Sequence, residues 1–448
     1  MPLVAVPGLF YRAVMPLWKK ASPDGSARPK RILAGHNGSA EAVAIAPDGT
    51  WLATVSWDET GRIWAADGTP RAVLTGHKEA VERVAIAPDG TWLATVSWDG
   101  TGRIWAADGA PRAVLTGHGG SVEAVAIAPD GAWLVTGGED GTARIWAADG
   151  APRAVLTGHG GPVEAVAIAP DGTWLATTSA DRTARIWAAD GTARATLTGH
   201  TGSVDAVAIA PDGTWLVTGS DDRTARIWAA DGAPRATLTG HTGRLWAVAI
   251  APDGTWLATT SADQTARIWA ADGAPRATLT GHTGSLIKHV VQAVAIAPDG
   301  TWLATACWDK TARTWAADGT ARATLTGHKS PVTGVAIAPD GTWLATSSGD
   351  NTARIWAVDS VPGHPGDGAA EVTAAPAGPA PPPEKDAEVT AALAGPAPPA
   401  GAGAEATPAP ADPAPPPEKD AEATAEPARP AHHAGGDAEA TAEPAGPA

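Results

Sequence analysis

The sequence predicts an all-β fold, an eight-bladed β-propeller built from four-stranded antiparallel blades, and two observations carry this prediction. First, eight Gly-His dipeptides are regularly spaced: the histidines lie 41 residues apart from His36 to His282, and 46 residues separate His282 from His328. A period of this length is typical of one supersecondary unit stacked on copies of itself. Second, the copies consist of short apolar segments bounded by turn residues, without a helical period.

The fourth copy shows the order of elements within a repeat. Its strands are expected over 153–158, 163–169, 174–179 and 184–187. Pro170-Asp171-Gly172 predicts a tight turn, because proline presets φ and glycine supplies positive φ. Asp190-Gly191 is a strong hairpin signal. We therefore expect each repeat to form an antiparallel meander.

Ring closure is predicted by where the repeats begin and end. The first repeat is preceded by one extra strand before Gly35-His36, and the last repeat ends one strand short, at Ile355-Trp356. Exposed sheet edges invite aggregation, whereas a closed ring removes them. The N-terminal strand is therefore expected to pair with the last blade, which gives a propeller over residues 30–359.

The two flanks differ from the repeats. We interpret residues 1–29 as an N-terminal segment that carries a relic of another repeat, because Leu17-Trp18 and Asp24-Gly25 faintly resemble a repeat end. Residues 360–448 are rich in Ala, Pro and acidic residues. Low hydrophobicity and high proline content prevent a packed core, so this tail is expected to be disordered. It could serve as a spacer or as a docking arm.

Charge and cysteine content restrict the function classes. The chain has a net charge of −16, and most of the acidic excess lies in the tail, so the propeller is near neutral. This argues against nucleic-acid binding, which needs clustered Lys and Arg. Cys307 is the only cysteine, which is typical of a reducing compartment. Prolines interrupt the apolar residues 1–20, so neither a signal peptide nor a membrane span is expected. We expect a monomeric cytoplasmic protein.

The repeats resemble the WD-repeat β-propeller family in their Gly-His corner, Pro-Asp-Gly turn, Leu-Ala-Thr strand, turn aspartate and final Ile-Trp. One departure is systematic, since the dipeptide that names the family is Trp-Ala in every copy. The resemblance implies a structural hydrogen-bond chain in each blade. Its members would be His36, Thr54, Asp58 and Trp64 in the first copy and His159, Thr177, Asp181 and Trp187 in the fourth. Such a chain satisfies polar groups that are buried.

Thr, His and Asp together also resemble a nucleophile with its acid–base partners. An active site is made once, however, and this set is made eight times. The histidines lie in separate blades, so they do not share a strand at metal-ligand spacing. We therefore expect no catalytic residue, no metal site and no cofactor.

Two positions vary among the otherwise similar copies. The first, two residues before each Val-Ala-Ile, holds Glu41, Glu82, Glu123, Glu164, Asp205, Trp246, Gln292 and Thr333. The second, directly before the turn aspartate, holds Trp57, Trp98, Glu139, Ala180, Asp221, Ala262, Trp308 and Gly349. In WD-repeat relatives both positions lie on the top rim, which commonly takes partners.

The predicted partner-binding surface comprises the polar and aromatic members of both sets, together with Ile287, Lys288 and His289. These three belong to an insertion over 286–290, which either projects or lengthens a strand. Acidic residues occupy the first position in blades 1 to 5, and tryptophans lie on blades 6, 7, 1 and 2. Carboxylates steer cations and tryptophan faces bind them, so we expect a protein partner with a Lys/Arg-rich segment. Alternatively, the acids are simply solvated and the tryptophans cover blade edges.

The function expected from these features is that of a non-catalytic interaction scaffold. The copies look like the high-identity WD-repeat arrays that are fused to signalling modules in bacteria, and this resemblance implies a scaffold or sensor. Two alternatives remain: a structural repeat protein without a dedicated ligand, and an enzyme that uses the central funnel. Cys307 replaces a strand serine and is expected to be a small buried apolar residue rather than a reactive thiol.

Overall fold

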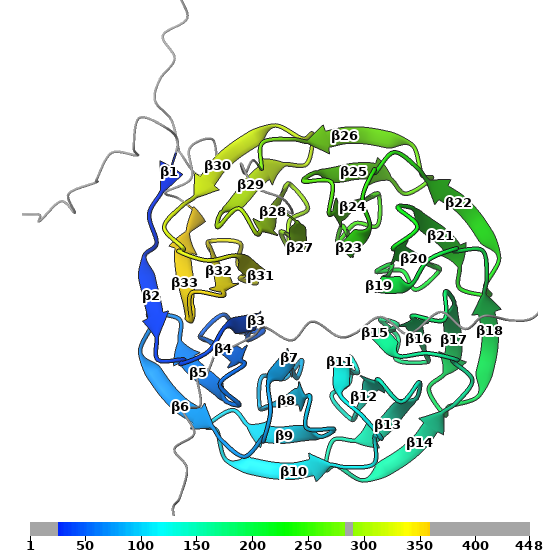
Figure 1. Cartoon of the computed structure of the whole chain (residues 1–448), viewed down its shortest axis with the longest axis horizontal. Coiled ribbons are helices and arrows are strands. Elements are labelled where there is room, and N and C mark those ends of the chain that lie inside the picture. Colours follow the sequence, from blue (N-terminus) through cyan, green and yellow to red (C-terminus); the bar gives the residue numbers. More distant parts are fainter. Residues whose placement is uncertain (1–25, 283–289, 359–448) are drawn as a thin grey trace, which may run out of the picture. The chain divides into compact units, whose positions relative to one another are not determined.

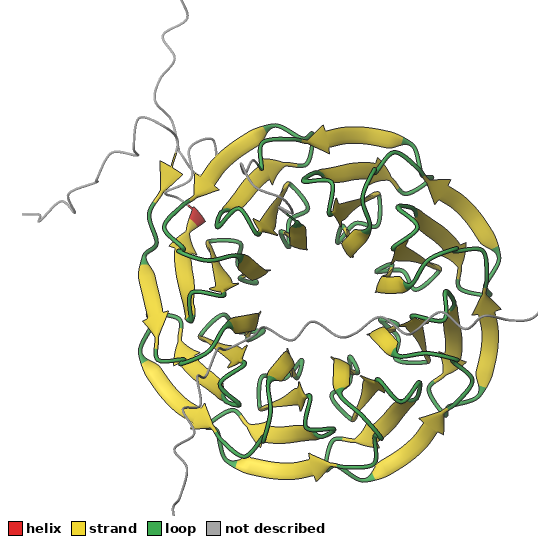
Figure 2. Ribbon diagram, viewed as in Figure 1, coloured by secondary structure: helices red, strands yellow, loops and turns green. Residues whose placement is uncertain are grey.

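The structure is a computed structural model that describes residues 26–282 and 290–358. Within these ranges, eight blades, each built on four antiparallel strands, are arranged in a ring (Figure 1), with turns and loops between the strands (Figure 2). The predicted eight-bladed β-propeller is thus confirmed. No helix in the described ranges is both long and apolar enough to cross a bilayer.

The strands of blades 1 to 4 follow one another in the chain, from the centre of the ring outward. Blade 1 contains β3 (Ala40–Ile45), β4 (Trp51–Ser56), β5 (Gly61–Ala65) and β6 (Pro70–Leu74). Blade 2 contains β7 (Val81–Ile86), β8 (Trp92–Ser97), β9 (Gly102–Ala106) and β10 (Pro111–Leu115). Blade 3 contains β11 (Val122–Ile127), β12 (Trp133–Gly138), β13 (Ala143–Ala147) and β14 (Pro152–Leu156). Blade 4 contains β15 (Val163–Ile168), β16 (Trp174–Ser179), β17 (Ala184–Ala188) and β18 (Ala193–Leu197).

Blades 5 to 7 repeat this order, and blade 8 takes its outer strand from the N-terminal side. Blade 5 contains β19 (Val204–Ile209), β20 (Trp215–Ser220), β21 (Ala225–Ala229) and β22 (Pro234–Leu238). Blade 6 contains β23 (Leu245–Ile250), β24 (Trp256–Ser261), β25 (Ala266–Ala270) and β26 (Pro275–Leu279). Blade 7 contains β27 (Val291–Ile296), β28 (Trp302–Cys307), β29 (Ala312–Ala316) and β30 (Ala321–Leu325). Blade 8 contains β31 (Val332–Ile337), β32 (Trp343–Ser348), β33 (Thr352–Ala357) and β2 (Arg31–Ala34).

The ring closes as the sequence predicts. β2 pairs antiparallel with β33, with Arg31 opposite Ile355 and Ala34 opposite Thr352. A two-residue strand, β1 (Ser26–Ala27), was not predicted: it pairs in parallel with β30 and adds a fifth strand to blade 7. The repeat relic sought at Leu17-Trp18 lies outside the described residues, as do the tail from residue 359 onward and the inserted residues up to 289.

The hydrophobic core lies between blades rather than inside any one of them. Trp51, Ile63 and Leu74 of blade 1 pack in one cluster with Leu93 and Trp105 of blade 2. A single blade cannot bury both faces, so each blade depends on its neighbours. The apolar residues that recur in every copy therefore hold the ring together and fix where the innermost strands lie.

Candidate partner-binding surface

Each blade contains a hydrogen-bonded link, seen clearly in blade 4. The indole Nε1–H of Trp187 donates to Thr177 Oγ1 over 2.9 Å. The Thr177 hydroxyl lies 2.8 Å from His159 Nε2, and His159 Nδ1 lies 2.9 Å from Asp181 Oδ2. With a neutral histidine, every polar hydrogen in this series has an acceptor. We call this series the Trp-Thr-His-Asp link.

The link joins consecutive blades. His159 follows β14, the outer strand of blade 3, whereas Thr177 and Asp181 belong to blade 4. The same bonds connect His36, Thr54, Asp58 and Trp64 across the closure between blades 8 and 1. They also recur in the other six blades. This arrangement explains the regular Gly-His spacing as scaffold.

In blade 4, the surroundings of the link lower the pKa of both its aspartate and its histidine. Burial lowers the pKa of His159 below its ordinary value. Burial would raise the pKa of Asp181, but hydrogen bonds from the Thr183 hydroxyl, the Gly160 N–H and His159 outweigh it and lower that pKa to about 2. The histidine is thus committed at both ring nitrogens to structural bonds.

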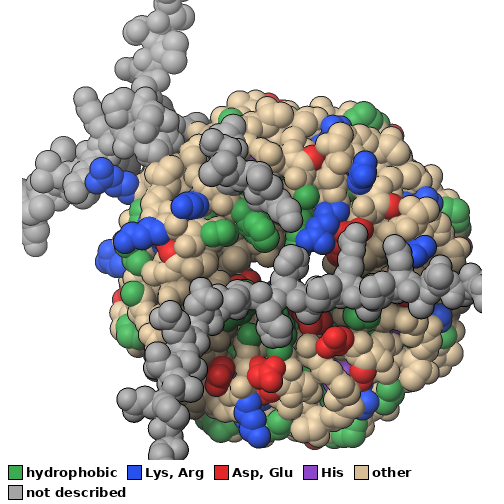
Figure 3. Space-filling model, viewed as in Figure 1, with side chains coloured by type: hydrophobic (Ala, Val, Ile, Leu, Met, Phe, Trp, Pro, Cys, Tyr) green, Lys and Arg blue, Asp and Glu red, His purple; other side chains and the backbone are tan. Residues whose placement is uncertain are grey.

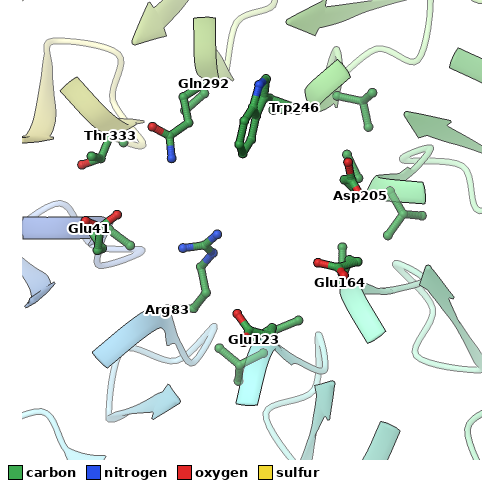
Figure 4. A pocket seen from close by; sticks show the side chains of 18 of the residues that line it. Glu41, Arg83, Glu123, Glu164, Asp205, Trp246, Gln292 and Thr333 are labelled. Carbon is green, nitrogen blue, oxygen red and sulfur yellow. The ribbon is translucent and has the colours of Figure 1, made fainter. Parts of the chain in front are cut away.

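The variable residues of the inner strands surround the central channel of the ring, a cavity of about 380 Å³. Figure 4 shows side chains from seven of the first variable positions around it, with Trp246 extending inward from β23. These lining residues are Glu41, Glu123, Glu164, Asp205, Trp246, Gln292 and Thr333. Glu82 is not among them, and the neighbouring Arg83 extends from β7 into the cavity instead.

The sequence reasoning missed Arg83. Its Nη1 lies 3.1 Å from Glu82 Oε1, and 47% of its side chain is exposed. Every other copy has Ala or Gly at this position. This single departure was the available signal, and it places a cation among the acidic residues of blades 1 to 5.

The carboxyl groups along the cavity have raised pKa values. Burial raises the pKa of Glu123 to about 7, with Glu82 adding to the effect and Arg83 opposing it. Burial likewise raises the pKa of Glu164 to about 7, reinforced by Asp205 and other nearby acids. The pKa of Asp205 is also raised to about 7, chiefly by burial and against a hydrogen bond from Ser203. The pKa of Glu41 is raised for the same main reason.

Tryptophans at the variable positions form two contacting pairs. Trp57 and Trp98 are 52% and 42% exposed, and their ring centroids are 5.9 Å apart at an interplanar angle of 44°. The ring centroids of Trp246 and Trp308 are 6.3 Å apart. On the face shown in Figure 3, acidic side chains lie below the central opening and a hydrophobic patch lies above it.

The family profile "WD domain, G-beta repeat" matches eight segments of the chain, which together cover more than half of it. They are residues 27–65, 68–106, 109–147, 150–188, 191–229, 232–270, 273–316 and 319–357. The chain belongs to the WD-repeat family. This family generally mediates protein–protein interactions or scaffolding. No curated protein sequence gives a significant match.

The remaining predicted residues of this WD-repeat propeller have varied surroundings. Glu139 accepts a hydrogen bond from the Ser121 hydroxyl over 3.1 Å. Thr333 donates to the carbonyl of Ala40 over 2.6 Å and so joins blade 8 to blade 1. Trp308 Nε1–H donates to Gln292 Oε1 over 2.6 Å. Ile287, Lys288 and His289 lie outside the described residues.

Blade 7 of the WD-repeat ring brings His282, Cys307 and Asp309 together, with possible ligand atoms within 4.8 Å of one another. This proximity follows from the repeat, because Cys307 Sγ accepts the Asp309 N–H just as Ser56 Oγ accepts the Asp58 N–H. His282 Nδ1 is engaged with Asp309 over 2.9 Å. Burial raises the pKa of Cys307 to about 12, which disfavours the thiolate that metals bind. The cluster is therefore part of the Trp-Thr-His-Asp link of blade 7, with Cys307 in place of the serine that lies beside the link in blade 1.

Proposed function

We propose that this protein is a non-catalytic scaffold whose top rim, the rim that carries Trp57, Trp98 and the cavity acids, holds a Lys/Arg-rich segment of a protein partner. The observation that carries the proposal is the exposed Trp57–Trp98 pair on a ring whose channel is lined by carboxyl groups. Indole faces attract ammonium and guanidinium groups, each for about 0.5–2 kcal/mol. A solvent-exposed pair of aromatic rings in contact with each other is typical of a surface that binds a partner.

Charge supports the same partner. Glu41, Glu123, Glu164 and Asp205 come from four inner strands and face one cavity, as Figure 4 shows. Their raised pKa values reflect poor solvation and mutual repulsion. An incoming cation relieves both, because it favours the ionised carboxylates. A cationic segment therefore gains more here than an anionic or neutral one.

We include in the proposal that the protein acts in the cytoplasm as a monomer and binds neither nucleic acid nor membrane. The near-neutral repeats and the single cysteine support this part of the proposal. Light scattering of the full chain tests the monomeric state, and fractionation of source cells tests the location. A sensor role in signalling remains part of the same proposal.

The test replaces both exposed tryptophans with a residue that the repeat already uses. Trp57→Ala with Trp98→Ala gives blades 1 and 2 the alanine that stands in blades 4 and 6 as Ala180 and Ala262. Partners are cross-linked to the wild-type chain in source lysate, and the contacting segment is mapped and synthesised. We expect the double variant to bind this segment more weakly by about tenfold or more, since tryptophans that become buried against a partner are frequent hot spots.

Two controls complete this test. The double variant must keep the wild-type melting temperature, because the exposed rings contribute little to the core. A synthetic segment with Gln in place of Lys and Arg should lose binding. Equal binding by wild type and double variant, or by both synthetic segments, would contradict the proposed function.

A further inference from the structure

Three side chains lie together between blades 5 and 6, and each is of a residue type that no other copy has at the same repeat position. Asp221 stands directly before the turn aspartate of blade 5, where no other copy has Asp. Arg244 stands two residues before Trp246, where blades 1, 3 and 5 have serine. Trp246 is the only aromatic residue at the first variable position. Their convergence is informative because the rest of the repeat is nearly constant.

The Arg244 guanidinium lies between an aromatic face and a carboxylate. Its Cζ is 3.7 Å from the ring centroid of Trp246. Its Nη1 is 3.7 Å from Asp221 Oδ1. A cavity of about 270 Å³ lined by all three residues, Glu164 and Asp205 adjoins this arrangement. The Arg244 guanidinium thus makes the two contacts, with an indole face and with a carboxylate, that a cationic ligand would make here.

This hold on Arg244 is weak. The Arg244 and Asp221 side chains are 44% and 37% exposed, and exposed ion pairs contribute about 0–1 kcal/mol. Asp221 Oδ1 is shielded from solvent yet accepts no hydrogen bond. In the described ranges we find no hydrogen bond from the Arg244 guanidinium, whereas Arg185 donates to the Gly158 carbonyl over 2.6 Å. Arg244 can therefore leave without breaking a hydrogen bond.

We propose that Trp246 and Asp221 form a subsite for one guanidinium or ammonium group, which Arg244 occupies as an internal stand-in and which a cationic side chain of a partner takes over by displacing it. The identity of that side chain rests on the proposed function, because it would belong to the partner's Lys/Arg-rich segment. The subsite itself is independent of any native partner. Since Arg244 competes for the position, it lowers the affinity of every cationic ligand that uses it.

The test removes the stand-in with a substitution taken from the repeat. Arg244→Ser gives blade 6 the serine of Ser39, Ser121 and Ser203. The probe is a synthetic alternating Gly-Arg peptide, with a Gly-Gln peptide of equal length for comparison, titrated calorimetrically into the full chain at low salt. We expect the variant to bind the Gly-Arg peptide about three- to tenfold more tightly than wild type. The Gly-Gln peptide should show no gain.

A matched control separates the subsite from the general loss of positive charge. Arg223→Gln removes one charge from the exposed turn of blade 5 and introduces the residue that blade 6 has there, Gln264. Both positions have a similar positive φ, 70° and 71°, so the backbone accepts the change. A smaller gain for Arg223→Gln supports the subsite. Equal gains for the two variants, or no gain for Arg244→Ser, would overturn it.

A second variant tests the aromatic face. Adding Trp246→Gln to Arg244→Ser introduces the residue that blade 7 has as Gln292, and it should abolish the gain. Persistence of the gain would also overturn the subsite. Trp57→Ala with Trp98→Ala should leave the affinity ratio between Arg244→Ser and wild type unchanged. Failure of the proposed function is thereby distinguished from failure of the subsite.

Discussion

Two of the acidic residues in blade 4, Asp181 and Glu164, have opposite electrostatic properties. Asp181 accepts hydrogen bonds from His159, the Gly160 N–H, the Thr183 N–H and the Thr183 hydroxyl, and its pKa is lowered to about 2. Glu164 faces the channel, has no hydrogen bond to its carboxyl group among the described residues, and has a pKa raised to about 7. The chemical group is the same, so the difference comes from its surroundings: hydrogen-bond donors lower the pKa of Asp181, whereas burial and neighbouring acids raise the pKa of Glu164.

This contrast separates scaffold from surface. The aspartate recurs in every blade, and the fold supplies the donors that keep it ionised. The channel acids vary from blade to blade, and burial without sufficient donors raises their pKa values. A side chain that the fold does not satisfy is available to a ligand, which is why the variable set is the better candidate for binding.

The largest expected effect comes from breaking a Trp-Thr-His-Asp link. Asp181→Asn keeps the size of the side chain but turns an amide NH₂ toward groups that are themselves donors. We expect a loss of about 2–4 kcal/mol in the free energy of unfolding near neutral pH, measured by urea denaturation. The pKa of Asp181 is lowered from 3.8, so its contribution is present above pH 4 and is lost as the pH falls through about 2.

Glu164→Gln is the matched control in the same blade. It should not destabilise the protein, because Glu164 is not hydrogen-bonded within the described residues. An Asp181→Asn variant as stable as wild type near neutral pH would contradict the structural role of the link.

The second prediction concerns the channel carboxyl groups, whose contribution to stability has the opposite dependence on pH. Glu123, Glu164 and Asp205 keep their protons to about pH 7 in the folded state, whereas the unfolded chain loses them near pH 4. Their protonated forms therefore favour folding, and this contribution is lost as the pH rises through about 7. Replacing them with Gln, Gln and Asn should stabilise the protein relative to wild type at about pH 8, on the order of 2–4 kcal/mol.

The measurement is the stability difference between this triple variant and wild type at about pH 4 and pH 8. Taking the difference cancels the contributions of all groups that the two proteins share. The difference should grow with pH. A constant difference would show that the channel carboxyl groups are ionised at ordinary pH.

The repeated features were the ones that sequence predicted well. Strand order, closure by β2 and the bonds from His159 to Thr177 and Asp181 follow a pattern that each copy restates. The short strand β1 carries no repeat signature, and only two residue pairs hold it. It could not be found from sequence because backbone pairing of that length leaves no side-chain pattern.

The channel lining was predicted less well, for a local reason. The pairing of β7 with β8 shifts register between Val81 and Arg83, and the same irregularity occurs in each other inner strand pair. A bulge disturbs strict alternation and re-aims neighbouring side chains. Consecutive residues of an inner strand can therefore both line the cavity, as Glu123 and Ala124 do in blade 3. Alternation alone could not tell that Arg83 rather than Glu82 lines it in blade 2. Nor could it show that Asp221 and Arg244 meet, because they belong to different blades.

The smallest expected effect concerns Arg83, the cation that lies among the channel carboxyl groups. Arg83→Ala restores the residue that most copies have, and it removes a cation that lowers the pKa of both Glu41 and Glu123. Both pKa values should rise, as measured by carbon-13 NMR titration of the side-chain carboxyl groups. Stability at about pH 8 should fall by about 0.5–1 kcal/mol, because the Arg83 side chain is partly exposed and its attraction is screened.

Arg71→Ala is the control for this last variant, since it removes the same charge from the outer strand β6. Its titration curves for Glu41 and Glu123 should match those of wild type. If Arg83→Ala also leaves them unchanged, Arg83 does not act on the channel carboxyl groups. The raised pKa values would then be due to burial and acidic neighbours alone, and the cation in blade 2 would have no part in tuning the cavity.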